Sequence, residues 1–416
     1  MEASLRDELV RLFDTKLSRQ MLLNLETCSR CGLCTPACHA YASMPLPKYA
    51  PAFRAEVVRR IYKRYFTALG RFAPVLGEAK PLTDAALEEL REAAYSCTGC
   101  RRCMVYCPFG IDTQQIMSIA KLLLIGAEAA PEILSLLADV SISKGESIET
   151  FKEGFLQGIK RLETQVVARW KVEAGTTPIP TEVEGADMLY VALAGAHSII
   201  PAAVVFNAAR ENWTLSFFEA VNFGAFVGDP GKTQLILDRI VREALRLGVK
   251  EVCICECGTA VRVAKQLSGT QPFRVVSLTE VHARYLREGR IRVKKLPGSH
   301  TYHDPCQIAR NGGVYDEPRA ILGRIVEDFR EMSPDPKYNW CCGGGGGLVA
   351  MGEDTLDFRM RSSRVKADQI RESRADVVVT ACENCHTQLE NINAHYGLGK
   401  EVKFLSSLLA DALVAP

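Results

Sequence analysis

The sequence has no apolar run long enough to cross a membrane. Its most apolar stretch, Met188 to Ala208, is interrupted by His197, Pro201 and Asn207, whereas a bilayer-spanning helix needs about 20 predominantly apolar residues. The first ten residues, MEASLRDELV, lack the apolar segment of a secretory signal. We therefore expect a cytoplasmic protein without a membrane span.

The sequence also lacks a large net charge and a dinucleotide-binding motif. The chain has 51 basic and 49 acidic residues, a net charge of +2, so the total charge gives no reason to expect a nucleic-acid partner. No G-x-G-x-x-G motif stands between a predicted strand and helix. We expect no nicotinamide or flavin site, and electrons must then come from or go to a partner.

Cysteine, by contrast, is abundant. Thirteen of the 16 cysteines fall in metal-ligand spacings, and two runs, residues 28–38 and 97–107, each read C-x2-C-x2-C-x3-C. This spacing puts three thiolates on one cubane [4Fe–4S] cluster and the fourth on its neighbour. Zinc ribbons use two separated C-x2-C pairs instead. The predicted ligands are Cys28, Cys31, Cys34 and Cys107 for one cluster, and Cys97, Cys100, Cys103 and Cys38 for the other.

The N-terminal part, residues 1–175, is predicted to be a mainly helical, ferredoxin-like domain around these runs. His39 stands where a proline usually follows the fourth cysteine. Between the runs, Phe53 to Leu69 has the pattern of an amphipathic helix with basic residues largely on one side. That helix either docks on a membrane surface or an acidic partner, or has an ordinary solvated face. The turn-rich segment 175–185 marks the expected domain boundary.

From residue 186 onward, short β-branched runs alternate with helical patterns, as in an α/β sheet. The pattern occurs twice, and predicts two related modules at 186–295 and 296–416. Expected elements include a strand at 215–221 and helices at 318–332 and 355–372. The fold class expected is therefore α+β and multi-domain, with a duplicated α/β module and a site between the halves at the carboxyl ends of the strands.

The second module gathers five cysteines from three loops: Cys306, Cys341, Cys342, Cys382 and Cys385. Adjacent cysteines reach one metal centre only if the backbone turns sharply. The glycines at 343–347 allow such a turn and bring backbone N–H groups near sulfur. Five thiolates exceed the four that a cubane needs, so either one is free for chemistry or the cluster is unusual.

The two four-cysteine runs followed by C-x(n)-CCG-x(n)-C-x2-C resemble the family of the heterodisulfide reductase catalytic subunit, over about residues 28–107 and 187–416. In that family each CCG module holds a noncubane [4Fe–4S] cluster. The resemblance implies that the five cysteines of the second module hold one such cluster here.

The first module departs from the family pattern, because it has no CCG and keeps only Cys253, Cys255 and Cys257. Its Glu256-Cys257-Gly258-Thr259-Ala260 segment is most similar to the subunit of the sulfite-reduction membrane complex, for which a disulfide or trisulfide of a small sulfur-carrier protein is the implied substrate. Alternation along the strand places the three cysteines on one face. Cys257, at the strand end, is the candidate site thiol or extra ligand.

Further candidate catalytic residues flank the cluster ligands. His303 and Arg310 lie on either side of Cys306, and His386 follows Cys385. Each either donates a proton to a departing thiolate or hydrogen-bonds a cluster sulfur.

Three functions remain open. The chain is a disulfide- or trisulfide-reducing subunit whose two cubanes connect a quinone or cytochrome partner with the noncubane cluster. Alternatively, it is a pure relay between a membrane quinone-reactive cytochrome and a soluble dehydrogenase or ferredoxin-type partner, or a scaffold stabilised by its cluster. The expected partners are a membrane cytochrome b or quinone-interacting subunit, other subunits of a respiratory redox complex and a small sulfur carrier. We expect them to attach the chain peripherally to the inner face of the cell membrane.

Overall fold

The computed structural model describes residues 1–172, 175–193, 195–334 and 336–414. The chain forms two compact units, and each combines segments that are distant in sequence. Unit 1 contains residues 1–137, 223–230 and 340–368, and unit 2 contains residues 138–222, 231–339 and 369–416.

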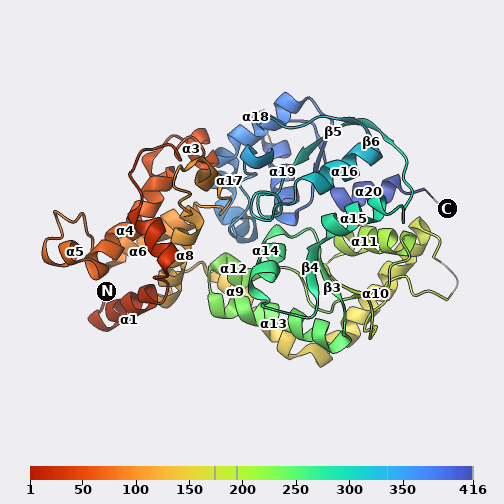
Figure 1. Ribbon diagram of the computed structural model, residues 1–416, viewed down its shortest axis with the longest axis horizontal. Coiled ribbons are helices and arrows are strands. Elements are labelled where there is room, and N and C mark those ends of the chain that lie inside the picture. Colours follow the sequence, from red (N-terminus) through yellow and green to blue (C-terminus); the bar gives the residue numbers. More distant parts are fainter. Residues whose placement is uncertain (173–174, 194, 335, 415–416) are drawn as a thin grey trace. The chain divides into compact units, whose positions relative to one another are not determined.

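Unit 1 is helical (Figure 1). Helix α2 begins where the Ser18 hydroxyl accepts the N–H of Met21, and α6 where the Thr83 hydroxyl accepts that of Ala86. Its complete helices are α1 (Ala3–Asp14), α2 (Arg19–Glu26), α3 (His39–Ser43), η1 (Pro47–Tyr49), α4 (Pro51–Phe66), α5 (Ala68–Phe72), α6 (Asp84–Tyr95), α7 (Arg102–Tyr106), α8 (Thr113–Gly126), α12 (Phe223–Val227), η3 (Val349–Thr355) and α17 (Leu356–Ser362). Its core is built from the apolar faces of α1, α4, α6 and α8.

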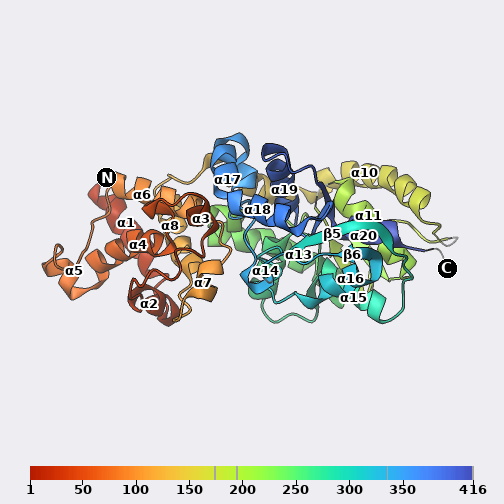
Figure 2. The same ribbon diagram turned by 90° about the horizontal axis from the view of Figure 1, so that it is seen from above.

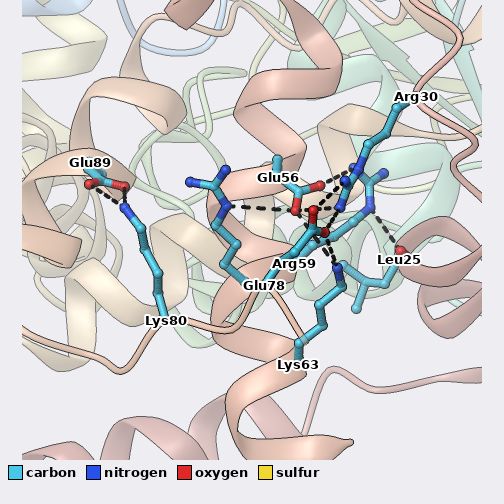
Figure 3. Close-up of polar contacts among 9 residues, drawn as sticks. Leu25, Arg30, Glu56, Arg59, Lys63, Glu78, Lys80 and Glu89 are labelled. Atoms are coloured by element: carbon cyan, nitrogen blue, oxygen red, sulfur yellow. Dashed lines mark hydrogen bonds and ion pairs between the residues drawn. The ribbon is translucent and has the colours of Figure 1, made fainter. Parts of the chain in front are cut away.

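The amphipathic helix predicted at 53–69 is α4, but its basic residues are not all on a solvated side. Arg54 and Arg59 are buried. The Arg59 guanidinium donates to the carbonyl oxygen of Leu25 at 2.8 Å (Figure 3). It also donates to the carbonyl oxygen of Asn24 at 3.2 Å. The prediction of a basic docking face along this helix was therefore wrong for these two arginines, because their charges bind groups inside unit 1.

Unit 2 contains two four-stranded parallel sheets with the strand orders β2-β1-β3-β4 and β6-β5-β7-β8. The strands are β1 (Met188–Val191), β2 (Trp213–Leu215), β3 (Glu251–Ile254), β4 (Arg274–Ser277), β5 (Leu296–His303), β6 (Val326–Phe329), β7 (Val377–Thr380) and β8 (Glu401–Phe404). In each sheet the first strand along the chain pairs with the second on one side and the third on the other. Strands β1 and β3 are buried throughout, as expected for central parallel strands.

Helices connect these strands, and some contact the neighbouring sheet's helices. The complete helices of unit 2 are α10 (Ile148–Arg169), α11 (Ala196–Ala208), α14 (Gly258–Leu267), α15 (Leu278–Arg287), α16 (Asp316–Ile325), η2 (Pro336–Tyr338), α19 (Glu383–His395) and α20 (Leu405–Ala412). Helices α9 (Glu132–Glu146), α13 (Pro230–Leu247) and α18 (Arg364–Ser373) each cross a unit boundary. Within unit 2, α11 of the first half packs on α20 of the second, and α15 packs on α16.

Three expected elements differ from the structure. The strand expected at 215–221 lies earlier, at β2. The helix expected at 318–332 ends at Ile325, and β6 follows it, because this segment pairs with β5. The helix expected at 355–372 is interrupted at Ser363 between α17 and α18. Short apolar runs fit the helix and strand periods alike, so the positions of β2 and β6 depend on their pairing with neighbouring strands.

No described helix combines the length and apolarity that a bilayer crossing requires. The run Met188 to Ala208 forms β1 and α11 instead.

Candidate iron–sulfur centres and sulfur site

The first predicted cubane ligand set lies around one small cavity in unit 1. Its lining includes all four cysteines of the set, Cys28, Cys31, Cys34 and Cys107. Burial raises the pKa of Cys34, with Cys28 and Cys107 adding to the shift. Cys103 of the second set also lines this cavity, and the four sulfurs of the first set around it suit a cubane.

The second ligand set is also brought together in unit 1. Burial raises the pKa of Cys97, and nearby Cys100 and Cys38 raise it further. The buried guanidinium of Arg54 donates to the Cys38 sulfur over 3.4 Å and to the carbonyl oxygen of Ser96 over 2.9 Å. A buried cation among thiolates compensates part of their charge, which suits a set of cluster ligands.

His39, which replaces the usual proline, occupies a special position. It is 2% exposed, and neither ring nitrogen has a hydrogen-bond partner among the residues that the structure describes. One ligand atom each from His39, Cys100 and Cys341 lie within 4.8 Å of one another. The imidazole therefore stands beside a sulfur of the second cysteine run and a sulfur of the CCG segment. Sequence reasoning assigned His39 no role beyond the missing proline.

The glycine segment after Cys341 and Cys342 packs on the second cysteine run inside unit 1. A Cβ on Gly345 would lie 2.8 Å from the Thr98 carbonyl oxygen, and one on Gly346 would lie 2.7 Å from that of Cys97. These approaches leave no room for a side chain. The ammonium of Lys121 donates to the Gly346 carbonyl oxygen over 3.1 Å, and burial lowers the pKa of Lys121 to about 8.

Backbone N–H groups of this segment point at its sulfurs. Gly343 N–H donates to the Cys341 sulfur at 3.4 Å, and Gly344 N–H donates to the Cys342 sulfur at 3.5 Å. Such donors stabilise thiolates, so both cysteines suit cluster ligation. Within unit 1, the guanidinium of Arg102 stacks 3.5 Å from the ring centroid of Trp340, and the Ser363 hydroxyl donates to the Cys342 carbonyl oxygen. These contacts hold the CCG turn in place.

The other three cysteines of the CCG set, Cys306, Cys382 and Cys385, belong to unit 2. Cys306 follows β5, whereas Cys382 and Cys385 lie at the start of α19 after β7. A hydrogen bond with Cys385 lowers the pKa of Cys382, and the N–H of Gly258 contributes to the same shift. The parallel neighbours β5 and β7 thus deliver these sulfurs to one end of their sheet.

Cys257 lies beside Cys382 in unit 2, although it follows β3 of the first sheet and Cys382 follows β7 of the second. Burial raises the pKa of Cys257 to about 12, and the neighbouring Cys382 adds to the shift. A Cβ on Gly258 would lie 2.8 Å from Cβ of Gln307, the residue after Cys306. Strand β3 ends at Ile254, so strand alternation does not extend to Cys257. The start of α14, and not the strand, positions this thiol.

Glu256 is a candidate that sequence reasoning missed. Burial raises the pKa of its carboxyl group to about 7, while Ser406 opposes the shift with hydrogen bonds from its hydroxyl and its N–H. The backbone carbonyl of Glu256 accepts the N–H of Glu383 at 2.8 Å. This residue therefore joins the two halves of unit 2 and can hold a proton near neutral pH. In the sequence, the position of Glu256 between Cys255 and Cys257 was the one feature that could have indicated this role.

The structure also locates the three weaker catalytic candidates. His303 is buried, with its Nδ1 3.5 Å from the side-chain nitrogen of Asn339. The Arg310 guanidinium donates to the carbonyl oxygens of Lys337 and Asn339, which suits positioning of that loop. His386 stacks on Phe404 with ring centroids 4.0 Å apart. His303 and His386 remain candidate proton donors.

Comparison with known proteins agrees with this geometry. Residues 24–111 match a 4Fe-4S dicluster domain, and residues 300–390 match a cysteine-rich domain named CCG. An iron–sulfur subunit of an Hdr-like menaquinol oxidoreductase from Archaeoglobus fulgidus is 26% identical over 95% of this chain and 81% of its own length. One subunit of a dihydromethanophenazine:CoB–CoM heterodisulfide reductase from Methanosarcina barkeri is 28% identical over 96% of this chain and 97% of its own length.

The chain is therefore an iron–sulfur protein of the oxidoreductase class, with a dicluster domain followed by a CCG domain. Over nearly its whole length it is similar to heterodisulfide reductase-like iron–sulfur subunits. An EtfAB:quinone oxidoreductase from Syntrophomonas wolfei is a more distant relative, 23% identical over 88% of this chain and 55% of its own length. The likeness to the sulfite-reduction subunit stays a prediction.

Proposed function

We propose that this chain is the disulfide- or trisulfide-reducing iron–sulfur subunit of a membrane-associated respiratory redox complex. The observation that carries the proposal is the placement of Cys257 beside Cys382, with Gly258 donating to the Cys382 sulfur. A thiol from one half beside a predicted cluster ligand from the other is an arrangement that pure electron relay does not require.

The reaction proposed for a disulfide breaks one S–S bond, takes up two electrons and two protons, and yields two thiols. The electrons come from a quinol or cytochrome partner. A cluster held by the CCG cysteines would pass them on one at a time. The chain's own residues orient the substrate sulfur and supply protons, and Glu256, His303 and His386 are the buried or half-buried candidates.

The proposed cofactors are two cubane [4Fe–4S] clusters and one further [4Fe–4S] cluster, of cubane or noncubane form. Thiolates near Arg54, and backbone N–H donors at Gly343 and Gly344, support the ligand assignment. The complete CCG ligand set combines Cys341 and Cys342 with Cys306, Cys382 and Cys385. Assignment of these five to one cluster rests on the domain match at 300–390.

The proposed architecture is a helical ferredoxin-like domain at 1–175 and a duplicated α/β module at 186–295 and 296–416. The two sheets have equivalent strand orders, β2-β1-β3-β4 and β6-β5-β7-β8, which supports duplication. The proposed location is the inner face of the cell membrane. Attachment there involves a cytochrome b or quinone-interacting subunit, and a small sulfur carrier presents the substrate.

The experiment that tests this function is EPR of the anaerobically purified, oxidised protein titrated with a disulfide or trisulfide and with the corresponding thiol. A new signal that appears only with the sulfur substrate, at the spin concentration of one centre per chain, supports the proposal. Spectra that are unchanged at saturating substrate, in a protein with full iron content, contradict it.

The alternative is an electron relay between a membrane quinone-reactive cytochrome and a soluble dehydrogenase or ferredoxin-type partner. Two relatives, a menaquinol oxidoreductase and an EtfAB:quinone oxidoreductase, are quinone-linked enzymes and favour this alternative. Under it, all clusters are reduced by a partner while no sulfur compound alters their spectra.

A further inference from the structure

One segment of unit 1 exposes four large apolar side chains that the proposed function does not use. Leu69, Phe72, Val75 and Leu76 are 57%, 89%, 90% and 78% exposed. We call this set the apolar tip. Single exposed apolar residues are ordinary on protein surfaces, but several within eight residues mark an interaction site.

The apolar tip is held by a closed loop. A Cβ on Gly77 would lie 2.9 Å from Cα of Gly70, so the two ends of the loop touch. The N–H of Gly77 donates to the Ala73 carbonyl oxygen at 2.9 Å, and the N–H of Ala79 donates to that of Pro74 at 2.8 Å. The loop's backbone thus forms hydrogen bonds within itself, while its apolar side chains face outward.

Cations flank the apolar tip without carboxylate partners. The guanidinium of Arg64 donates to the carbonyl oxygens of Gly70 and Arg71. The guanidinium of Arg71 donates to that of Tyr65. Within the described parts of the chain, neither arginine has a carboxylate at ion-pair distance.

The surrounding segment is also basic. Residues 60–80 contain five basic residues and one acidic residue, Glu78, a net charge of +4. The carboxylate of Glu78 pairs with Arg30 and with Lys63, the latter at 3.0 Å (Figure 3). The guanidinium of Arg30 and the ammonium of Lys63 hold the pKa of Glu78 at about 2. The one acidic residue of the segment is therefore neutralised by cations.

The tip stands away from the CCG segment of its own unit. Figures 1 and 2 both show α5 at the end of unit 1 opposite α3 and α17.

We propose that the apolar tip inserts into the interface of an anionic lipid bilayer, with Arg64 and Arg71 at the level of the phosphate groups. An apolar group with flanking cations is the combination that binds anionic membrane surfaces. This surface replaces the side of α4 that the sequence suggested for docking, where Arg54 and Arg59 are buried. The proposal is independent of the disulfide chemistry.

The test is co-sedimentation of the full chain, carrying its clusters, with vesicles. One set is phosphatidylcholine alone, and the other contains about one third phosphatidylglycerol. We expect binding to the anionic vesicles, and a loss of at least about tenfold in the double variant Phe72→Ser/Val75→Ser. Arg71→Gln should weaken binding to the anionic vesicles. Leu235→Ser is the matched control, because Leu235 is 52% exposed on α13 and should bind like the parent.

Iron content and far-UV circular dichroism establish that each variant is folded. Equal binding by the parent and the double variant overturns the proposal, as does equal binding of the parent to both vesicle types. Failure of the parent to bind any vesicle, combined with loss of a co-purifying membrane subunit from the double variant, assigns the tip to a protein partner and also overturns it. Loss of disulfide turnover with unchanged vesicle binding would affect only the proposed function.

Discussion

The thiol of Cys341 donates to the hydroxyl oxygen of Thr98 over 3.4 Å, although the two residues are 243 positions apart in the sequence. Thr98 follows Cys97, the first residue of the second cysteine run. The CCG turn and this run are therefore parts of one structure within unit 1. Electron transfer between neighbouring centres benefits from such short separations.

Replacing Cys341 by serine should remove one centre. The parent should contain about twelve iron atoms, and Cys341→Ser about eight, because the eight cubane ligands all precede residue 108. Anaerobic iron and sulfide analysis measures this change. Cys253→Ser is the control, since Cys253 lies within β3. An unchanged iron content in Cys341→Ser would remove Cys341 from the ligand set.

Cys257→Ser should separate substrate handling from cluster assembly. If Cys257 meets the substrate sulfur, the variant keeps the parent's iron content and still accepts electrons from dithionite, measured by bleaching in the visible range. Disulfide turnover and the substrate-dependent EPR signal should be lost. Full turnover would make Cys257 a packed thiol, and loss of iron would make it a ligand.

Glu256 should make stability depend on pH. Its pKa is about 7 in the folded chain and 4.5 for the free side chain, so the folded state binds more protons between these values. Stability should therefore fall as pH rises from about 4.5 to 7, by up to about 3 kcal/mol, and level off above. Glu256→Gln should remove this slope, as measured by urea unfolding at pH 5 and pH 8 relative to the parent.

Glu251 provides a control of opposite sign. The Arg284 guanidinium, 2.7 Å away, lowers the pKa of Glu251. The ion pair of Glu251 therefore stabilises the fold at pH values above the pKa of this carboxyl group in the unfolded chain, and this stabilisation is lost as the pH falls. Glu251→Gln should then lower the free energy of unfolding more at neutral than at acidic pH. Parallel pH profiles for the parent and Glu256→Gln would show that the Glu256 carboxyl titrates normally.

His39→Leu should change the potential of the centre held through Cys100. An imidazole N–H near cluster sulfur stabilises the reduced, more negative state, and its removal should lower the reduction potential. A redox titration monitored by EPR measures the shift, with iron content as the control for assembly. His39→Gln, which keeps an N–H donor, should restore part of it. Equal potentials in the parent and both variants would limit His39 to packing.

The grouping of the cysteines in the two runs could be predicted from the sequence. The spacing inside each four-cysteine run is short, so covalent geometry limits where its sulfurs can go. The sets around Cys34 and Cys97 accordingly lie together in the structure. The alternation of strands and helices likewise predicted two parallel α/β halves, because each strand's apolar run needs helices on both faces.

Only the tertiary structure shows which charged groups are buried and which residues distant in sequence come into contact. Arg59 looked like part of a solvated face, but carbonyls from α2 bind it. Glu256 acquires its raised pKa from burial, in a place where it also meets Ser406, 150 positions away in the sequence. His39 stands beside Cys341 because the glycine turn packs on the second cysteine run. Local spacing determines ligands that lie within one run, whereas burial and electrostatics depend on segments that only folding brings into contact.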